Sequence, residues 1–429
     1  MNEKGVFRKI KGDSTIWAVF FLLCVISIIE VFSASSGLTY KSGSYWAPML
    51  KHAGLLLVGF LFMIGTMNIK CKYFKIVTPF ALIFSLIMLI VVLLVGQTTN
   101  GAQRWISLFG VQFQPSEIAK GAVVLAVAQV LSAMQTENGA DRRAFKYVMW
   151  ITLPFTFLIA SENLSTAALL FFTVMLLMFV GRVPRGQYGR MLGLIAITVM
   201  GGFAAIMAMG QKADAQPSPA TKSTMVDQAL ATASASEPAV IDKIFHRAGT
   251  WHSRINKFLS NEKVPPADYD LDKDAQVAHA NIAIVSSNLM GKGPGNSVER
   301  DFLSQAYSDF IYAIIIEELG IEGAVIVLIL YIVLLFRTAT IANRCVNAFP
   351  ALLIMGVALL LVTQAMFNMA VAVGLVPVTG QPLPLISKGG TSTIVNCIYI
   401  GIILSVSYSA KKKDDEADLN TQAATVNEE

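Results

Sequence analysis

The segment VPVTGQPLPLISKGGTS, residues 376–392, lies between two long apolar stretches. Three prolines and three glycines interrupt it. It cannot continue either stretch as a helix, because proline lacks the amide donor and glycine is conformationally loose. Between two membrane spans, non-helical backbone is tolerated only where protein buries it or where it lines a watery cavity. A kinked connector is the ordinary interpretation of such a segment, and the lining of a functional cavity is the alternative.

The composition indicates a membrane protein. Of the 429 residues, 55% are hydrophobic and only 14% are charged, with a mean hydropathy of +0.60. In a soluble domain, roughly a quarter of the residues are charged. The net charge of +5 does not indicate nucleic acid as a partner, because the basic residues stand beside apolar segments, where they orient membrane spans. The four cysteines show neither metal-ligand nor disulfide spacing, and the four histidines do not cluster.

Apolar runs of about twenty residues are long enough to cross a bilayer. Ten such runs predict a single all-α polytopic domain over residues 1–429, with spans at residues 15–34, 49–68, 76–96, 116–133, 147–161, 164–181, 191–210, 309–336, 347–374 and 391–410. The fifth and sixth runs meet at Ser161-Glu162-Asn163. We expect a turn there, because one helix over 147–181 would be about 50 Å long, too long for a single crossing.

Lysine and arginine gather on alternate loops, which predicts the orientation in the membrane. Both termini are expected in the cytoplasm, with residues 411–429 as a cytoplasmic tail and residues 211–308 as one large extracytoplasmic loop. Within this loop, residues 211–240 are rich in Ala, Ser, Thr and Pro and are expected to be flexible. Residues 244–259 have the pattern of a basic amphipathic helix, which suits either a lipid surface or packing on the loop itself. A further helix is expected over residues 275–290, followed by a glycine-rich segment that lacks P-loop spacing.

A first block of polar residues reads GAQRWI at 101–106 and FQPSEIAK at 113–120. Glu117 and Lys120 are three positions apart, so they share one face of the predicted helix. Charged side chains inside an apolar helix are costly and face either each other or a cavity. The pair is therefore either a buried structural ion pair or part of a polar lining for an anionic or sugar ligand.

A second block reads YSDFIYA at 307–313 and continues to EELG at 317–320. Asp309 is expected at the outer start of the eighth span, where the positive end of the helix dipole favours an ionised carboxylate. Simple helix capping would explain the same position. Glu317 lies about two turns deeper, roughly 12 Å along the axis, on a similar face, which suggests a polar track into the helix.

Together the three blocks closely resemble the signature motifs of the SEDS family (shape, elongation, division and sporulation), whose members are cell-wall polymerases of the FtsW and RodA types. The first block matches the family pattern GAxRWI followed by QPSExxK, and the second matches HTDFIFAVxxEELG except that Tyr307-Ser308 replaces HT. Residues 387–390 read SKGG where the family has SYGG, and residues 161–166 read SENLST where it has QPDLGT, so Asn163 replaces an aspartate. The resemblance covers nearly all of residues 15–410 apart from 211–240.

The resemblance implies the SEDS fold and a peptidoglycan glycosyltransferase that polymerises lipid II, the undecaprenyl-pyrophosphate disaccharide-pentapeptide, outside the cytoplasmic membrane. The family's essential aspartate maps onto Asp309, which would be the catalytic base. The expected substrate-binding residues are Arg104, Glu117, Lys120, Arg254, Ser387, Lys388, Gly389 and Gly390. The cations among them would oppose the leaving pyrophosphate. A divalent cation (Mg or Mn) could share this charge, but the sequence shows no ligand set for it.

The family usually works with a class B penicillin-binding transpeptidase and, in its division branch, with other divisome proteins. General similarity favours the FtsW type, acting at the division septum, over the RodA type. Three alternatives remain open at this point: a lipid II flippase, a RodA-type elongation polymerase, and a non-catalytic scaffold of the divisome. A flippase would need a polar route through the bundle and would not depend on one extracytoplasmic carboxylate, and a scaffold would tolerate the loss of Asp309.

Overall fold

The computed structural model describes residues 11–35, 46–95, 97–99, 102–108, 111–193, 275–303 and 306–428. The chain divides into two compact units. The first comprises Met1–Pro184 with Asp268–Glu429, and the second is Arg185–Ala267. The second unit is described only over residues 185–193, which are helical. The predicted flexible segment 211–240 and the predicted amphipathic helix 244–259 lie outside the described residues.

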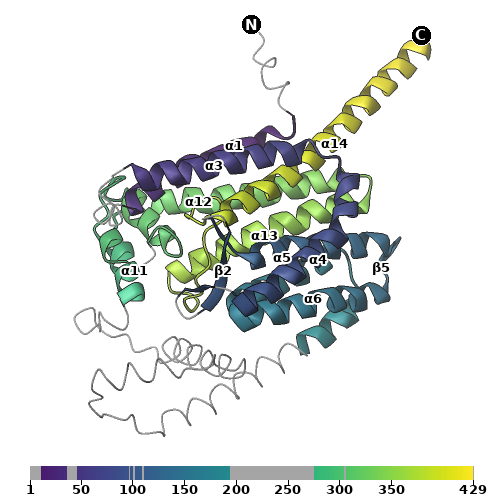
Figure 1. Cartoon of the computed structure of the whole chain (residues 1–429). Helices are drawn as coiled ribbons and strands as arrows, with labels where there is room; N and C mark the ends of the chain where they lie inside the picture. The colour runs from purple at the N-terminus through teal and green to yellow at the C-terminus, as the bar shows by residue number, and fades with distance from the viewer. Residues whose placement is uncertain are drawn as a thin grey trace. The chain divides into compact units, whose positions relative to one another are not determined.

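The first unit is a bundle of long helices (Figure 1). The helices in chain order are α1 (Ser14–Ala34), α3 (Ala47–Met67), α4 (Cys71–Val95), α5 (Pro115–Ala133), α6 (Arg142–Glu162), α7 (Leu164–Val180), α11 (Ala275–Ser286), the short η3 (Glu299–Asp301), α12 (Ile311–Asn343), α13 (Ala348–Ala372) and α14 (Thr391–Glu428). Among the described residues, eight helices are long and apolar enough to cross a membrane, and α7 is a shorter apolar one.

These helices confirm the polytopic all-α class and match nine of the predicted apolar runs, with ends that differ by up to seven residues. Only residues 191–193 of the predicted seventh span, 191–210, are described. The predicted helix over 275–290 is present as α11 and ends at Ser286. The predicted tail, residues 411–429, continues α14 as a helix up to Glu428.

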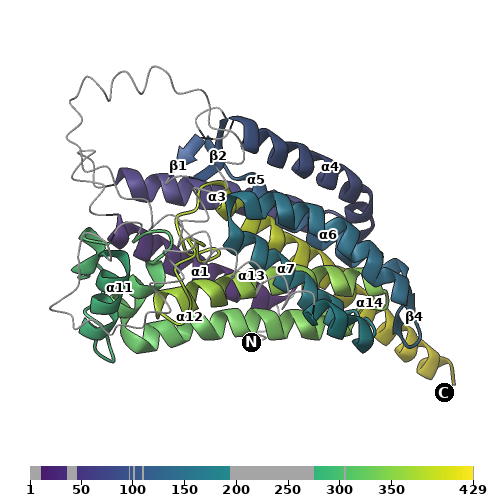
Figure 2. The same cartoon turned by 90° about the horizontal axis from the view of Figure 1, so that it is seen from below.

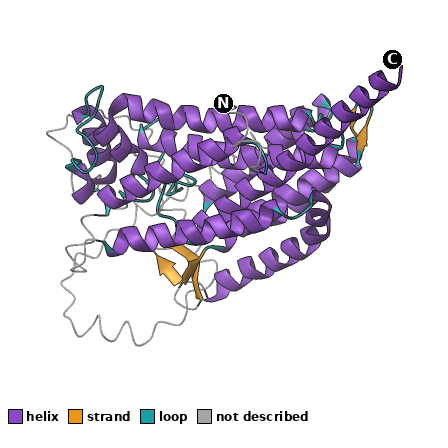
Figure 3. Cartoon of the chain, turned by 90° about the horizontal axis from the view of Figure 1, so that it is seen from above, coloured by secondary structure: helices purple, strands orange, loops and turns teal. Residues whose placement is uncertain are grey.

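Two small antiparallel sheets were not predicted from the sequence (Figure 3). The first has the order β1–β2–β3, with strands Gln97–Thr99, Ala102–Leu108 and Val111–Phe113. In its register Gln97 pairs with Trp105, and Ile106 pairs with Phe113. The second joins β4 (Gln135–Thr136) to β5 (Gly139–Ala140). Each sheet reverses the chain between two long helices. Residues 102–106 of the first motif lie in β2, which is followed by β3 and then α5.

Burial separates inner from outer helices. In the apolar stretches of α13 and α14, 78% of the residues are buried, whereas in those of α3 and α4 only 22% are buried. Figures 1 and 2 show α13 and α5 surrounded by other helices, with α4 on the outside. The exposed side of α4 carries large apolar residues such as Ile76, Phe80 and Ile83. A soluble protein rarely exposes so large an apolar patch, so this surface fits contact with a bilayer.

The turn predicted between the fifth and sixth spans is present. Helix α6 ends at Glu162 and α7 begins at Leu164, so a single residue, Asn163, separates the two helices. Asn163 is extended (φ −149°, ψ 95°), and its side-chain Oδ1 accepts a hydrogen bond of 3.3 Å from the amide of Thr166. Asparagine at this position therefore caps α7, because it satisfies one of the amides that a helix start leaves without a partner.

Helix α12 is broken at Gly320, which has φ 70° and ψ −172°. The loop after α11 presses against this break. A Cβ on Gly320 would lie 2.2 Å from the carbonyl oxygen of Leu289, a distance that only glycine allows. The amides of Lys292 and Gly293 donate to the carbonyls of Glu317 and Glu318 at 2.9 and 2.8 Å. The loop thus supplies the hydrogen bonds that the helix loses at its break.

Candidate active site

The segment between α13 and α14 folds back among the helices. Gly374, Gly380 and Gly390 have positive φ of 73°, 65° and 55°, and Leu385 also has a positive φ of 65°. The prolines remove further amide donors, so this backbone finds its partners outside regular structure. Below, the signature loop means residues 376–390. Most of its residues from Gln381 to Gly389 are buried, which agrees with the requirement that protein cover non-helical backbone at membrane depth.

Side chains from several helices hold the carbonyl groups of the signature loop. From α13, Gln364 Nε2 donates to Pro382 at 3.0 Å and Asn368 Nδ2 donates to Gln381 at 2.7 Å. From α1, the Ser27 hydroxyl donates to Ile386 at 2.7 Å. From α12, the Tyr331 hydroxyl donates to Pro384. These donors are polar residues inside apolar spans, and each satisfies a buried carbonyl that would otherwise be costly.

The second block lies directly against the signature loop. The amide of Lys388 donates to the carbonyl of Tyr307 at 2.9 Å, and the Ser387 hydroxyl donates to the carbonyl of Ser308 at 2.6 Å. Asn368 Nδ2 also donates to the carbonyl of Asp309 at 2.8 Å. Three consecutive carbonyls before α12 are therefore fixed by the loop or by its neighbour on α13.

Asp309 lies in the turn before α12 and is half-buried. The helix begins at Ile311 with Phe310 as the N-cap residue, so Asp309 stands one residue outside the capping position. Asp309 thus lies immediately before the start of α12, outside its first turn and its capping position. Its Oδ1 accepts a hydrogen bond of 3.0 Å from the Ser308 hydroxyl. This bond stabilises the ionised carboxylate.

Lys388 stands beside the same turn. Its Nζ lies 4.9 Å from the centre of the Tyr307 ring, which is the distance of a cation–π contact. Burial, and then the charge of Lys51, lower the pKa of Lys388. Burial raises the pKa of Tyr307, and the charge of Asp309 raises it further. A lysine therefore replaces the tyrosine of the family pattern at a position that places a cation near the Asp309 turn.

The local structure requires glycine at the two positions that follow Lys388. A Cβ on Gly389 would lie 2.0 Å from the Ser392 hydroxyl, which itself donates to the Gly389 carbonyl at 2.7 Å. Gly390 has a positive φ, as given above. The two glycines thus make the tight turn that starts α14. Ser387 is equally occupied, because its oxygen also accepts a hydrogen bond of 2.7 Å from the Leu383 amide.

Glu117 and Lys120 form a buried ion pair on α5. Their side chains are 2% and 0% exposed, and Lys120 Nζ lies 2.8 Å from Glu117 Oε1. Lys120 also donates to Gln364 Oε1 at 2.7 Å, and Gln364 in turn holds the signature loop. The geometry is that of a structural pair, one of the two interpretations above, and through Gln364 it supports the loop.

A second chain of contacts reaches the loop from α7. Gln381 Nε2 donates to the Thr166 hydroxyl at 2.7 Å, and the Thr166 amide is the one capped by Asn163. The turn that carries Asn163 therefore joins the same network as the signature loop and Asp309. The aspartate of the family pattern is replaced here by a residue that acts as a helix cap.

Glu317 and Glu318 serve the loop after α11. Glu317 binds Lys292 Nζ at 2.6 Å and the Val298 amide at 3.1 Å, and it accepts from the Ser297 hydroxyl. Glu318 accepts from the amides of Gly295 and Ser297 at 3.0 and 3.2 Å, and from the Ser33 hydroxyl of α1. In place of the expected polar track from Asp309, Glu317 and Glu318 therefore form a clamp on the loop after α11.

Two of the expected substrate-binding residues cannot be placed at the site. Arg104 belongs to β2, of which only the backbone is described at that position, and Arg254 lies outside the described residues. In contrast, Gln364, Asn368 and Gln381 were missed by the sequence analysis. Gln364 and Asn368 are polar residues inside an apolar span, and that is the signal that could have found them.

Comparisons with known proteins show the family to which this chain belongs. Residues 13–412 match the family described as Cell cycle protein, FTSW_RODA_SPOVE. The chain belongs to this family. The Escherichia coli K12 protein named peptidoglycan glycosyltransferase MrdB is 28% identical over 407 residues, which cover 94% of this chain and 96% of that protein. A probable peptidoglycan glycosyltransferase FtsW of Geobacter sp. strain M18 is also 28% identical, covering 93% and 98%.

Solved structures show the same fold. One similar chain comes from a structure of a peptidoglycan synthase complex that coordinates polymerization and crosslinking. It has a TM-score of 0.64 at 23% identity, and the match covers 93% of this chain and 98% of that one. Thermus thermophilus RodA gives a TM-score of 0.61 at 22% identity, with the same coverage. The comparisons confirm the SEDS family and the enzyme class of peptidoglycan glycosyltransferase that the motifs predict.

Proposed function

We propose that this chain polymerises lipid II into glycan strands at the outer face of the cytoplasmic membrane, with Asp309 as the general base. The observation that carries the proposal is the fixed position of the Asp309 turn. The signature loop and Asn368 hold the carbonyls of Tyr307, Ser308 and Asp309 by hydrogen bonds of 2.6 to 2.9 Å. A base must be held in place to take its proton efficiently, and this network fixes the backbone from which the carboxylate projects.

In the proposed reaction Asp309 removes the proton from the acceptor sugar hydroxyl as its oxygen attacks the anomeric carbon of the donor. The new glycosidic C–O bond forms while the bond from the anomeric carbon to the pyrophosphate oxygen breaks. The electron pair leaves with the lipid pyrophosphate, and the proton ends on the carboxyl group. Because the attack is a single displacement, the configuration at the donor carbon is inverted.

Lys388 is the cation that the described site offers to the leaving pyrophosphate. Its Nζ stands over Tyr307, two residues from Asp309. Its lowered pKa reflects partial burial and the nearby charge of Lys51, which make an anion a favourable neighbour. Lys120 is less suited to this role than the sequence suggested, because Glu117 and Gln364 already take its charge and hydrogen bonds.

Two polar atoms of the signature loop fit a sugar ligand. Gln381 Oε1 and the Thr379 hydroxyl are buried and have no hydrogen-bond partner among the described residues. Buried polar atoms are rarely left unpaired in folded proteins. Sugar hydroxyls or water would satisfy them, and their place beside the Asp309 turn is where an acceptor sugar is required.

The described residues do not suggest a metal site. No group of three or more His, Cys, Asp or Glu side chains within the described ranges is arranged to hold a metal ion. The divalent cation left open by the sequence therefore has no ligand set here, and no step of the proposed reaction depends on one.

The biological setting is also a proposal. A relative named FtsW and a relative named MrdB are each 28% identical to this chain. The two identities do not distinguish a role in cell division from one in cell elongation. We favour septal synthesis, as the sequence does, with RodA-type elongation as the alternative. The fold shared with a chain of a peptidoglycan synthase complex supports a class B penicillin-binding transpeptidase as partner. The lysine and arginine pattern supports both termini in the cytoplasm.

Purified full-length protein should convert lipid II into glycan strands that are resolved on a gel, with and without its transpeptidase. The same protein in sealed vesicles should not accelerate the movement of labelled lipid II between leaflets. Strand synthesis supports the polymerase. Rapid movement of lipid II without strand synthesis, even with the partner present, would instead support a flippase. Neither activity in a correctly folded complex would support a scaffold.

A further inference from the structure

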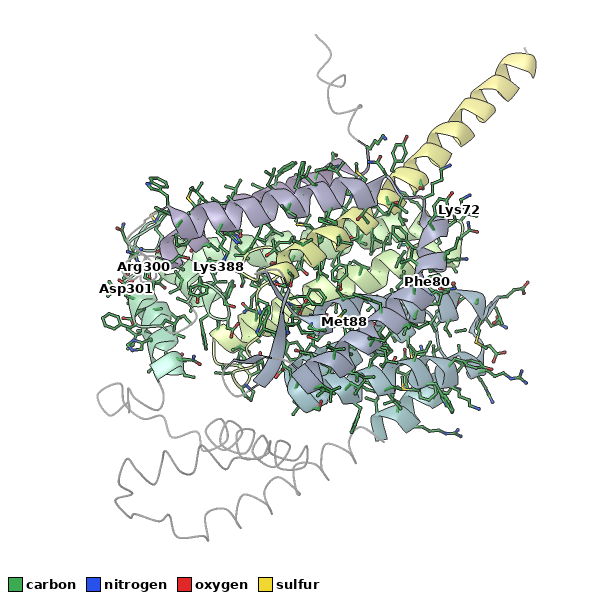
Figure 4. All side chains as sticks on the ribbon, viewed as in Figure 1. Lys72, Phe80, Met88, Arg300, Asp301 and Lys388 are labelled. Atoms are coloured by element: carbon green, nitrogen blue, oxygen red, sulfur yellow. The ribbon has the colours of Figure 1, made fainter. Side chains whose placement is uncertain are left out.

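A pocket of about 390 Å³ opens between the start of α4, the end of α5 and the start of α13. Lys72, Lys75 and Cys71 line it from α4, Ser132 from α5, and Asn347 and Phe349 from the start of α13. In Figure 4, Lys72 lies at one end of the helix bundle, Arg300 and Asp301 lie at the other, and Lys388 lies toward that other end. The pocket is therefore distinct from the candidate active site.

The pocket carries two lysine charges, Lys72 and Lys75. Lys72 and Lys75 are three positions apart and share one face of α4. Lys75 Nζ lies 4.8 Å from the centre of the Phe349 ring, so this side chain reaches from α4 to α13. Lys72 Nζ lies 5.1 Å from the Tyr73 ring. Neither lysine forms an ion pair with any residue that the structure describes.

Two helix starts add to this positive potential. Helices α4 and α13 are each 25 residues long, and both begin at the pocket, at Cys71 and Ala348. The first amides of a helix lack intrahelical partners, and the helix dipole is positive there. Asn347, the N-cap residue of α13, makes no capping hydrogen bond through its side chain in the described structure. Two cations and the amides of Ala348 and Phe349 at the start of α13 thus lie at one pocket of headgroup size, whereas Pro350 carries no amide.

The surface that leads away from the pocket is apolar and exposed. Ile76, Phe80, Ile83 and Ile87 follow one face of α4 and are 52% to 68% exposed. Figure 4 shows Phe80 and then Met88 following Lys72 along the helix. Such a face suits acyl chains. The pocket also lies at the end of the bundle for which the lysine and arginine pattern predicts the cytoplasm.

We propose that this pocket binds the headgroup of an anionic phospholipid of the inner leaflet, with the acyl chains along the exposed face of α4. The lysines and the helix starts would bind the phosphate. The Ser132 hydroxyl, which donates to the Gln129 carbonyl at 2.9 Å, would accept from a headgroup hydroxyl. Because the pocket is formed by α4, α5 and α13, the bound lipid would hold together helices that carry Lys120, Gln364 and Asn368 at greater depth.

Native mass spectrometry of the full-length protein in neutral detergent tests the proposal, with phosphatidylglycerol as the probe and phosphatidylcholine as the neutral reference. Each lysine near an anionic headgroup contributes roughly fivefold in affinity, so Lys72→Gln/Lys75→Gln should weaken phosphatidylglycerol binding about thirtyfold. The matched control is Arg143→Gln/Lys146→Gln, an exposed pair with the same spacing at the start of α6, which should change binding less than threefold. Melting temperatures without lipid establish that both variants fold.

The position of the lipid is tested separately. In a variant that keeps Cys71 as its only cysteine, phosphatidylglycerol should slow the reaction of Cys71 with a maleimide, whereas phosphatidylcholine and inorganic phosphate should not. Equal losses in the two double variants, equal binding of phosphatidylcholine, or unchanged Cys71 reactivity would overturn the proposal in favour of diffuse charge attraction. Protection by inorganic phosphate at similar concentration would overturn the lipid assignment in favour of a soluble anion.

Discussion

The side-chain amide of Asn368 donates one hydrogen bond to the backbone carbonyl of Asp309, at 2.8 Å, and another to that of Gln381, at 2.7 Å. One fully buried residue of α13 therefore joins the aspartate turn to the signature loop. We infer that Asn368 is a positioning residue. Its Nδ2 atom holds the backbone that carries the Asp309 carboxylate and does not itself contact the substrate.

Replacing Asn368 by alanine should impair polymerisation more than substrate binding. The variant leaves two buried carbonyls without a donor, each at a cost of about 1 to 3 kcal/mol, and frees the Asp309 turn. A small displacement of a catalytic group can cost roughly a hundredfold in rate. We expect kcat to fall about ten- to a hundredfold with KM for lipid II within threefold.

Asn343→Ala, an exposed asparagine at the far end of α12, is the control and should leave both constants unchanged. A rise in KM at constant kcat would show that Asn368 binds substrate and does not position Asp309.

The break in α12 should not tolerate a side chain. Gly320→Ala places a Cβ 2.2 Å from the Leu289 carbonyl, at a φ of 70° that disfavours residues other than glycine. The loop clamped by Glu317 and Glu318 must then move, so we expect a lower melting temperature and faster amide hydrogen exchange over residues 289–300. Gly54→Ala in α3, which meets no atom within 4 Å, should be neutral or stabilising. Unchanged exchange in Gly320→Ala would mean that the loop does not depend on the break.

The start of α1 should show an acid-sensitive contribution to stability. Asp13 caps this helix and binds Arg337 of α12, whose Nε and Nη2 lie 2.8 and 2.7 Å from Asp13 Oδ2. Burial alone would raise the pKa of Asp13, but the hydrogen bonds and charge of Arg337 lower it below the ordinary value of 3.8. The Asp13 carboxylate therefore binds a proton more readily in the unfolded chain than in the folded protein. The stability that the Asp13–Arg337 pair contributes is thus present above about pH 4 and is lost as the pH falls further.

Asp13→Asn keeps a capping side chain and removes the charge. We expect it to be destabilised at pH 7 by about 1 kcal/mol, with the difference from the parent protein shrinking at pH 3. Melting temperatures at both pH values measure this. A difference that persists undiminished at pH 3 would show that the ion pair does not cause it.

The sequence predicted the parts of the fold that depend on the length of apolar runs. The membrane helices and the turn at Asn163 were found because runs of about twenty apolar residues and a polar interruption are local signals. The break at Gly320 was not found, since EELG reads as ordinary helix until the loop at Leu289 is known to press on it. The sheet of β1 to β3 was missed for a related reason, because its strands are short and pair only with each other.

The site divides in the same way. Asp309 and the signature loop were recognised by their motifs, and the structure brings them together. The roles of Lys120, Ser387 and Asn163 could not be predicted, because each depends on a partner far along the chain: Gln364, Ser308 and, through Thr166, Gln381. Residue type indicates that a buried polar group needs a partner, but not which one.

The predicted orientation can be tested with single cysteines in a cysteine-free variant. The lysine and arginine pattern predicts that a cysteine at Ser218 reacts with a membrane-impermeant thiol reagent in intact cells, and that one at Thr421 does not. Labelling of the Ser218 site only after membrane disruption would reverse the topology and place the Asp309 turn on the cytoplasmic side.

The most direct test is the rate of glycan strand formation from lipid II by Asp309→Asn in complex with its transpeptidase. Asparagine keeps the size and most hydrogen bonds but cannot accept the proton, and loss of a general base typically costs about 10²- to 10⁴-fold. We predict a loss of this size with normal expression, melting temperature and partner binding, and little effect of Asp301→Asn, an exposed carboxylate of the same loop. Near-normal strand formation by Asp309→Asn would contradict the assignment of Asp309 as the catalytic base.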